Sequence, residues 1–229
     1  LEEMAQRIYK EWFVDFKYPG HENDKMVDSE LGMISEGWEV KKFGDYFSIN
    51  RGISHQGKYL SDDGNPLLNL KSMLPGGGYR RDGLKYYNGP YKERHTVKEG
   101  DIFIANTDLK QTGPVIGNAA IVPKLDYDGD LLLTHHMYVV RFHDNYQNHS
   151  YYFFLTINSH NYKSHALGHA SGTTVLGLQQ ESVLEYKFPM PTNSLLERFS
   201  KIANPVFDCL EKYNLMVENL RQTRDLLLP

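Results

Sequence analysis

The chain has 229 residues, of which 40% are hydrophobic and 24% charged, and its formal net charge is −4. This length allows one domain with a sizeable core plus accessory helices. No apolar run approaches the ~20 residues of a membrane span and no signal-peptide pattern opens the sequence, so we expect no membrane partner. The single cysteine, Cys209, excludes an internal disulfide and fits a reducing compartment, and we therefore expect a cytoplasmic protein.

The charge is unevenly distributed along the chain. Residues 1–37 contain four Lys or Arg and nine Asp or Glu, a balance of −5, whereas the other 192 residues contain 21 basic and 20 acidic side chains, a balance of +1. The main body is therefore close to neutral. Its charge neither excludes nor requires a nucleic-acid partner.

An amphipathic helix is predicted for residues 1–17, because apolar residues recur four apart and charged residues lie mostly elsewhere. The members of its apolar stripe are Met4, Ile8, Trp12 and Phe16. Pro19 and Gly20 are expected to end the helix, and the polar, acidic residues 21–37 are interpreted as a linker. Because the sequence starts inside a predicted helix, we expect a piece of a longer protein.

Residues 38–192 are predicted to form a β-rich body. Short apolar or alternating runs are separated by turns rich in Gly, Asn and Asp, which is the pattern of strands. The predicted strands are residues 38–40, 46–50, 66–70, 102–105, 115–122, 131–134 and 137–142.

Helices are expected at few places in this body. Residues 150–166 are predicted to be helical, and the inward-facing residues are expected to be Phe153, Phe154, Ile157 and Leu167. A glycine-rich loop at 168–172 precedes a predicted helical turn at 179–184 and a strand at 185–190. The predicted fold class is therefore α+β, a β-rich mixed domain with long terminal helices.

One long helix is predicted at the end of the chain. From Val206 onward larger residues alternate four and three apart, the spacing of a heptad seam that lies along another helix. The members of this seam are Val206, Leu210, Tyr213, Val217, Leu220, Arg224 and Leu227. The spacing alone leaves two interpretations open: a surface helix packed on its own domain, or a helix paired with the N-terminal helix or with another chain.

Three separated stretches resemble one family. Residues 1–20 (LEEMAQRIYKEWFVDFKYPG) and 36–52 (EGWEVKKFGDYFSINRG) are similar to the end of the central conserved helix and the entry of the target recognition domain in the specificity subunit of type I restriction-modification enzymes. Residues 172–191 (GTTVLGLQQESVLEYKFPMP), followed by LLERFSKIANPVFD and LRQTRDLLLP, resemble the exit of that domain and the distal conserved helix. KEGDIFIANT at 98–107 resembles an interior strand of the same domain.

This resemblance implies a division of the chain and a non-catalytic role in host defence. It assigns 1–20 to the end of the central helix, 21–37 to a linker, 38–192 to one target recognition domain and 193–229 to the distal helix. The terminal helices would form an antiparallel coiled coil. The chain would recognise one half of a bipartite site in double-stranded DNA, and the family's second recognition domain is absent from this sequence.

The same resemblance implies partners and interface residues. Methyltransferase subunits would dock on the helices, a restriction subunit would join in the full complex, and a homodimer is an open alternative. No cofactor is expected on this chain, since S-adenosylmethionine, ATP and Mg²⁺ would be held by partner subunits only. The expected helix-interface residues are Met4, Ile8, Trp12, Phe16, Val206, Leu210, Tyr213, Val217, Leu220 and Leu227.

Neither a catalytic site nor a metal site is predicted. Residues 88–91 (NGPY) come within one residue of an amino-methyltransferase motif but lack its first proline, so we interpret them as a turn. Neighbours such as His135 and His136 would point to opposite faces of a strand, and His165 with His169 has no obvious third ligand. A stand-alone methyltransferase or nuclease is the alternative function.

Four loops are candidate DNA contacts, because they offer cations and hydrogen-bonding side chains of the kinds that bind phosphates and base edges. For any one of these loops, an ordinary solvated surface is the competing interpretation. The candidate residues are Arg51, Ser54, His55, Gln56 and Lys58 in the first loop, Tyr79, Arg80 and Arg81 in the second, Asn106, Thr107, Lys110 and Gln111 in the third, and Ser171, Thr173 and Thr174 in the fourth.

Overall fold

The computed structural model describes residues 1–80, 83–125, 127 and 129–228 of the chain. The chain divides into two compact units. Unit 1 consists of Leu1–Val40 and Pro189–Pro229, and unit 2 consists of Lys41–Phe188. Strands β3 (Glu39–Lys42) and β14 (Lys187–Met190), which carry the chain from one unit to the other, pair with each other.

Unit 2 is built on a four-stranded antiparallel sheet in the order β10-β8-β12-β4. Its strands are β4 (Phe47–Arg51), β8 (Ile102–Ala105), β10 (Ala119–Ile121) and β12 (Met137–Phe142). All four residues of β8 and the first four of β12 are buried, so these central strands are continuous apolar runs rather than alternating ones. The bounds predicted for these two strands are confirmed.

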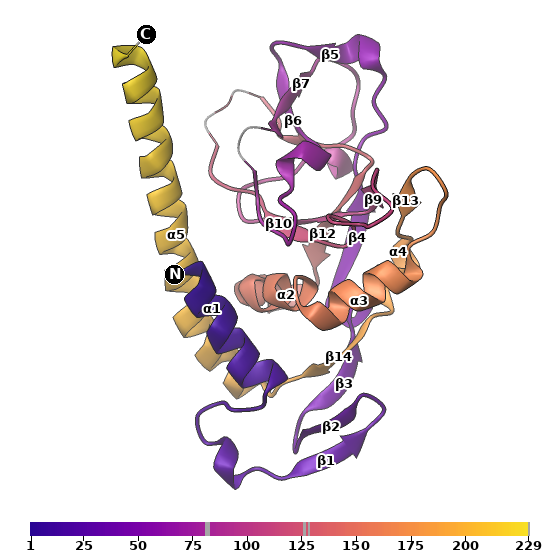
Figure 1. Ribbon diagram of the computed structural model, residues 1–229, viewed down its shortest axis with the longest axis vertical. Coiled ribbons are helices and arrows are strands. Elements are labelled where there is room, and N and C mark those ends of the chain that lie inside the picture. The colour runs from indigo at the N-terminus through magenta and orange to yellow at the C-terminus, as the bar shows by residue number, and fades with distance from the viewer. Residues whose placement is uncertain (81–82, 126, 128, 229) are drawn as a thin grey trace. The chain divides into compact units, whose positions relative to one another are not determined.

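A second four-stranded sheet in the order β11-β6-β7-β5 covers one face of this central sheet (Figure 1). Its strands are β5 (Leu60–Ser61), β6 (Asn65–Leu68), β7 (Lys85–Tyr87) and β11 (Leu132–Leu133), and β11 pairs with β6 in parallel. Phe103 and Val139 of the central sheet pack with Leu68 and Leu133 of the second sheet in one apolar core.

Helices α2 (Ser150–Ile157) and α3 (His160–His169) cover the other face (Figure 1). The single helix predicted for 150–166 is wrong, because the chain breaks at Asn158 and the Ser159 hydroxyl caps α3 by accepting from the Tyr162 N–H. The second helix, α3, extends to His169, so the first two residues of the predicted glycine-rich loop at 168–172 are helical. Leu167, expected to face inward, is exposed, whereas the other three predicted core residues of this segment are buried.

Short elements complete unit 2. β9 (Thr107–Asp108) and β13 (Leu176–Gly177) pair as a two-stranded ribbon, and α4 (Gln180–Leu184) follows β13. Among the described residues, 3-10 helices are formed in unit 1 by His21–Asn23 and in unit 2 by Phe43–Asp45, Gly57–Tyr59, Leu70–Ser72, Glu93–His95 and Asp144–His149.

Unit 1 begins with α1 (Glu2–Tyr9), which continues as a π-helical turn over Lys10–Val14. The helical segment ends at Val14 with Asp15 as its C-cap, and Phe16 has a positive φ of 56°, so the helix is shorter than the predicted 1–17. The predicted stripe is also wrong in part, since Met4 is exposed and Ile8 half-buried. The buried face is formed by Ala5, Tyr9, Trp12 and Phe13, which lie at i, i+4, i+7 and i+8. This set keeps the regular helical period, so the predicted stripe lies one position away in the first two turns.

The segment interpreted as a linker contains a β-hairpin, formed by β1 (Met26–Ser29) and β2 (Gly32–Ser35). A two-residue turn at Glu30 and Leu31 joins the strands, and Gly32 adopts a φ of 92° that favours glycine. The hairpin was missed because residues 21–37 as a whole are polar and acidic in composition, although Met26, Val27, Leu31 and Met33 are exposed apolar residues within it.

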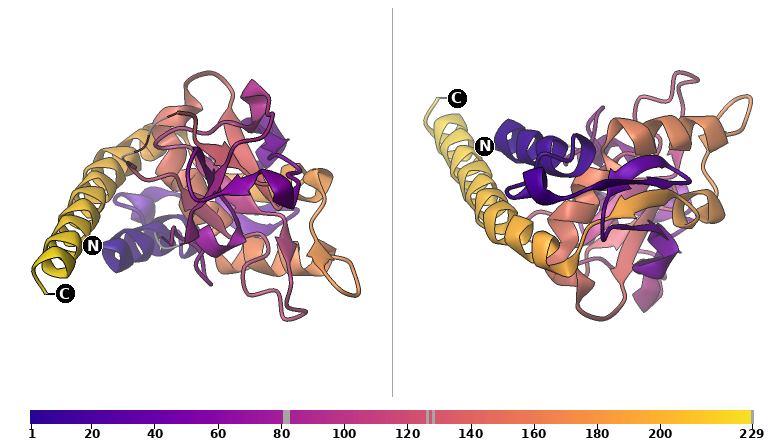
Figure 2. Two further views of the ribbon diagram at one scale, coloured as in Figure 1. Left: turned by 90° about the horizontal axis from the view of Figure 1, so that it is seen from above. Right: turned by 90° about the horizontal axis from the view of Figure 1, so that it is seen from below.

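The long helix predicted at the end of the chain is confirmed as α5 (Asn193–Leu227). The Thr192 hydroxyl caps its first turn by accepting from the Leu195 N–H at 3.4 Å, and Pro205 lies inside the helix. α1 runs antiparallel to the first half of α5, with its N-terminus beside the middle of that helix (Figures 1 and 2). None of the described helices is long and apolar enough to cross a membrane.

Candidate nucleic-acid interface

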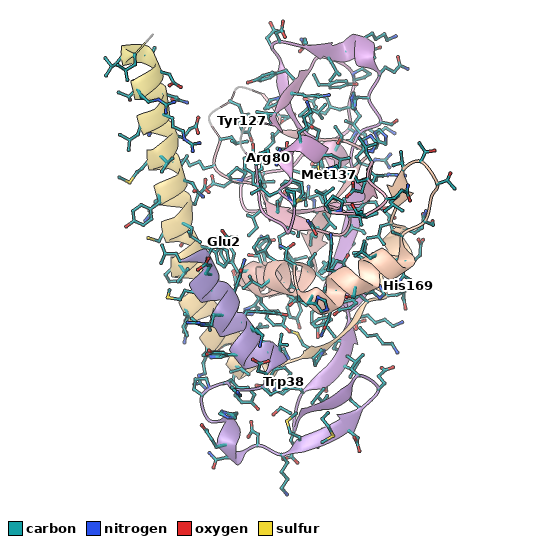
Figure 3. All side chains as sticks on the ribbon, viewed as in Figure 1. Glu2, Trp38, Arg80, Tyr127, Met137 and His169 are labelled. Atoms are coloured by element: carbon teal, nitrogen blue, oxygen red, sulfur yellow. The ribbon has the colours of Figure 1, made fainter. Side chains whose placement is uncertain are left out.

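The turn formed by His135 and His136, between β11 and β12, is the point on which several loops of unit 2 converge. The segment after β4 passes directly along it. The Ile53 N–H donates to Leu133 O at 2.6 Å, the His135 N–H donates to Ile53 O at 2.8 Å, and the Gly52 N–H donates to Met137 O at 3.1 Å. Met137, labelled in Figure 3, marks where this turn enters β12.

Gly52 makes this close approach possible. A Cβ atom at that position would overlap the backbone carbonyl oxygens of Leu133 and Thr134, so no other residue fits without moving the backbone. Gly52 therefore fixes where the first candidate loop, residues 51–58, leaves the sheet.

The third candidate loop holds the same turn from the other side. Asn106 accepts nothing from the turn but donates twice: its backbone N–H to His136 O at 3.0 Å and its Nδ2 to His135 O at 3.1 Å. The Thr107 hydroxyl is 2.9 Å from His136 Nδ1. Both side chains are buried, so we revise their predicted role from DNA contact to positioning of the histidine turn.

The fourth candidate loop joins the third through the β9–β13 ribbon. Asp108 and Thr107 pair with Leu176 and Gly177, and Gln111 Nε2 donates to Thr173 O at 3.0 Å. Three of the four candidate loops are thus connected around one turn. The exposed side chains that they present are Arg51, Ser54, Gln56, Lys58, Lys110, Gln111, Ser171, Thr173 and Thr174.

The second candidate loop is anchored elsewhere. Its Gly78 N–H donates to Ala119 O of β10, at the opposite edge of the central sheet from β4, and its Arg80 N–H donates to Ser72 O. Tyr79 is half-buried and packs against the core between the sheets, whereas Arg80 is exposed and is labelled in Figure 3. Arg81 lies outside the described residues.

Polar atoms without partners gather around the histidine turn. Within the described part of the chain, no hydrogen bond reaches His55 Nδ1, His135 Nδ1, Asn106 Oδ1 or Thr134 Oγ1, although all four atoms are buried. Asn106 and Thr134 are each only 1% exposed. An unpaired buried polar group costs about 1–3 kcal/mol, so this cluster is a place where ordered water or a ligand would stabilise the protein.

The histidines of the turn are neutral near pH 7. Burial, together with the smaller effects of the cationic forms of His135 and His55 and of the charge of Arg51, lowers the pKa of His136 to about 4. Burial likewise lowers the pKa of His55 and of His135. Arg51, whose Nε donates to His135 O at 2.9 Å, therefore provides the fixed positive charge beside this turn.

Asn88, which belongs to the segment compared with a methyltransferase motif, and His165, weighed as a metal ligand, have structural partners, as does the acidic residue Asp101. The buried Asp101 carboxylate forms an ion pair with Arg141 Nη1 at 2.7 Å. Asn88 Nδ2 donates to Ser61 Oγ at 2.9 Å, and His165 Nε2 lies 2.7 Å from Ser182 O. Among the described residues, no group of three or more His, Cys, Asp or Glu side chains is arranged to hold a metal ion.

Gly52, Thr134, His135 and His136 were not among the predicted DNA-binding residues. The two histidines were considered only as metal ligands. That interpretation was rejected because adjacent side chains on a strand point to opposite faces and cannot bind one ion. The available signal was that they interrupt two apolar runs, which marks a tight turn at the end of two buried strands.

A second surface lies on α5 in unit 1. Its first half packs on α1 through Phe199, whose ring lies 4.9 Å from Phe13, 6.0 Å from Trp12 and 6.4 Å from Tyr9 between centroids. The terminal helices therefore meet within one chain, but on residues that precede the predicted seam. Of that seam, Val206 and Leu210 are half-buried, and the exposed members are Tyr213, Val217, Leu220, Arg224 and Leu227.

Comparisons with known proteins point to one family. The profile of the type I restriction modification DNA specificity domain matches residues 35–204. The type I restriction enzyme MjaIX specificity subunit of Methanocaldococcus jannaschii is 24% identical over 237 aligned positions, which cover 100% of this chain and 51% of that protein. The chain thus spans about half the length of this curated relative.

Two solved structures share the fold. The S subunit of a type I restriction-modification system from M. genitalium aligns with a TM-score of 0.54 and 13% identity, over 82% of this chain and 44% of that one. The HsdS subunit from Thermoanaerobacter tengcongensis aligns with a TM-score of 0.53 and 14% identity, over 97% of this chain and 45% of that one.

Proposed function

The chain belongs to the family of type I restriction modification DNA specificity domains, and from this membership we propose that it recognises one half of an interrupted sequence in double-stranded DNA. A specificity domain is the DNA-recognition component of a type I system and not its catalyst. Methyl transfer and cleavage would then require partner subunits, which would hold the S-adenosylmethionine, ATP and Mg²⁺.

The observation that carries this proposal is the convergence of three loops on the turn of His135 and His136. The loops expose Arg51, Lys58 and Lys110, while Asp108, the one acidic residue within 51–58, 106–112 and 168–174, is buried and accepts backbone N–H groups. Cations favour the phosphate backbone, and exposed Gln, Ser and Thr side chains are suited to base edges.

We further propose that the exposed half of α5 docks a helix of another chain. Its apolar residues keep heptad spacing over exposed positions, and Leu220 is 67% exposed. The expected partner is a methyltransferase subunit, with a second copy of this chain as the alternative. About twice this length is found in the curated relative, so a second recognition domain would supply the other half-site there.

The direct experiment is selection of bound duplexes from a randomised pool, with and without the partner methyltransferase. We expect one short sequence to be enriched, with higher affinity when the methyltransferase is present. The double substitution Arg51→Ala with Lys110→Ala is expected to weaken binding at all sequences and to reduce the slope of log K against log salt by about 2.

A charge-matched control is Lys17→Ala with Lys25→Ala, two exposed lysines of unit 1. Equal losses in both double variants would show that only the net charge matters and would overturn the assignment of the loops. Methyl transfer or DNA cleavage by the purified chain alone, in the presence of S-adenosylmethionine or Mg²⁺, would support the stand-alone enzyme instead.

A further inference from the structure

The loop that follows β9 is held by the carboxylate of Asp108, which binds backbone N–H groups of the loop. The Asp108 carboxylate is buried and accepts three backbone N–H groups, from Lys110 at 2.9 Å, Val115 at 2.7 Å and Ile116 at 3.3 Å. A carboxylate satisfied by several N–H groups fixes the backbone that carries them. The tip of this loop, residues 109–112, therefore leaves the protein in a defined direction.

Lys163 of α3 holds the same loop by its carbonyl groups. Its Nζ donates to Ile116 O at 2.7 Å and to Asn118 Oδ1 at 2.6 Å, and Pro114 O lies at 3.5 Å. Burial lowers the pKa of Lys163 to about 8, while Asp108 counteracts this effect. The N–H groups of residues 110, 115 and 116 and the carbonyls of residues 114 and 116 are thus bound within the protein. Because this part of the loop is already ordered, little conformational entropy remains to be lost when a ligand binds.

This rigid loop presents a leucine to solvent. Leu109 is 71% exposed, more than any other large apolar side chain among the described residues of unit 2. The β9–β13 ribbon ends at the pair Asp108 with Leu176, and the residues next to this pair on the two segments are Leu109 and Val175, which is also exposed. A single exposed leucine is ordinary, but this one lies on a loop that the buried Asp108 and the half-buried Lys163 hold in place, so the loop itself keeps the leucine exposed.

The surroundings of Leu109 fit a base edge better than a protein. Lys110 and Gln111 follow it, and Thr173 lies across the ribbon, bonded to the Gln111 amide. Leu109, Val175 and Leu167, which lies against Gly113 of the loop, are three aliphatic side chains within a polar rim and are too few for a protein interface, which needs roughly 1,000 Å². The major groove admits a two-stranded ribbon, and the C5 methyl of thymine is the apolar group that aliphatic side chains contact there.

We propose that Leu109 is a specificity-determining residue that contacts the C5 methyl group of a thymine in the major groove. Lys110 binds an adjacent phosphate and so fixes the position of the β9–β13 ribbon along the DNA. The inference rests on the proposed function, because it requires that these loops bind duplex DNA.

The test uses the duplex selected by the full chain together with its methyltransferase partner. Each thymine is replaced in turn by deoxyuridine, which removes only the C5 methyl, and binding is measured for the wild type, Leu109→Ala and the control Leu74→Ala, a less exposed leucine of the same unit. At one thymine, the wild type and the control are expected to lose about fourfold in affinity, the effect of one buried methyl group. Leu109→Ala is expected to bind both duplexes equally.

The outcomes separate this inference from the proposed function. If the wild type tolerates deoxyuridine everywhere, if the selected site has no thymine, or if Leu109→Ala retains the fourfold discrimination, the assignment of Leu109 is overturned while sequence-specific binding stands. If the wild type selects no sequence, the proposed function fails. Unchanged thermal unfolding of Leu109→Ala shows that the variant is folded.

Discussion

The histidine turn of unit 2 and the second half of α5 in unit 1 differ in which groups lack partners. Around the turn, the unpaired groups are buried polar atoms, whereas along α5 they are exposed aliphatic side chains. Exposed polar atoms and buried leucines are the normal condition of a folded chain and identify nothing. The comparison teaches that buried polar atoms without partners and exposed leucines are the features that indicate a binding partner. The histidine turn therefore calls for a polar partner and the second half of α5 for an apolar one.

Phe199→Ala should produce the largest change, because it removes a buried ring that three aromatic residues of α1 surround. We expect unit 1 to lose about 3–5 kcal/mol of unfolding free energy. Leu220→Ala, on the exposed half of the same helix, should change it by less than about 0.5 kcal/mol. Both tryptophans, Trp12 and Trp38, lie in unit 1, so urea unfolding followed by their fluorescence measures this unit selectively. Similar losses in the two variants would show that the exposed half is packed within the chain.

The double substitution Val217→Asp with Leu220→Asp tests whether the exposed half of α5 binds another chain. Two charges in the seam should abolish association with the methyltransferase or with a second copy, at an expected cost of about 3 kcal/mol or more. Tryptophan-detected unfolding of the isolated chain should be unchanged. Sedimentation of the mixture measures the association, and Asn214→Asp with Gln222→Asp adds the same charge to other exposed positions of α5 as a control. Persistent association of the seam variant would exclude the seam as the interface.

Gly52→Ala tests the histidine turn. The added Cβ must displace the backbone of residues 133–134, and we expect a loss of about 1–3 kcal/mol in the stability of unit 2 together with weaker DNA binding. Hydrogen exchange at the Ile53 and His135 amides should accelerate. Gly57→Ala is the matched control, since a Cβ there meets nothing within 4 Å. An unaffected Gly52→Ala protein would mean that the close approach is not needed.

The smallest effect is expected from acid. Because the folded-state pKa of His136 is lowered from 6.5 to about 4, the unfolded chain binds a proton between these values that the folded chain does not. Stability should therefore fall as pH decreases through this window. The full shift corresponds to about 3 kcal/mol, which solvent around the half-buried ring reduces to the order of 1 kcal/mol.

His136→Asn should remove this part of the acid sensitivity, as measured by urea unfolding with circular dichroism at pH 7.5, 6 and 5. The exposed His160→Asn serves as the control. If His136→Asn and the wild type lose stability in parallel, His136 does not titrate as inferred.

Much of the fold was predictable because local pattern determined it. The fully buried strands β8 and β12 are continuous apolar runs bounded by polar turns, and α5 has an apolar stripe long enough to outweigh its internal proline. The β1–β2 hairpin and the buried face of α1 were not predictable in the same way. The apolar residues of the hairpin are mixed with acidic ones in a polar segment, and Ala5 with Tyr9 has the same helical spacing as Met4 with Ile8, so spacing alone could not choose between the two faces.

Many residues of the candidate site could be predicted from the sequence, but which loops lie next to each other could not. Composition identified the four loops, yet which of them meet depends on pairings between residues 29 to 84 positions apart, such as Thr107 with His136 and Arg51 with His135. Burial separated the positioning residues Asn106 and Thr107 from the exposed Lys110. The periodicity of α5 predicted the seam, but only packing could show where α1 ends and the uncovered half begins.

Pro205 has a mechanical consequence for α5. It lies near the boundary between the covered and uncovered halves and has no N–H, so it donates no hydrogen bond to the Lys201 carbonyl four residues earlier. The helix is therefore easiest to bend at this step. From Pro205 to Leu227 the lever is about 33 Å long, so a bend of about 10° displaces its tip by about 6 Å. Small angular changes at one proline therefore move the far end of the exposed seam by several ångströms.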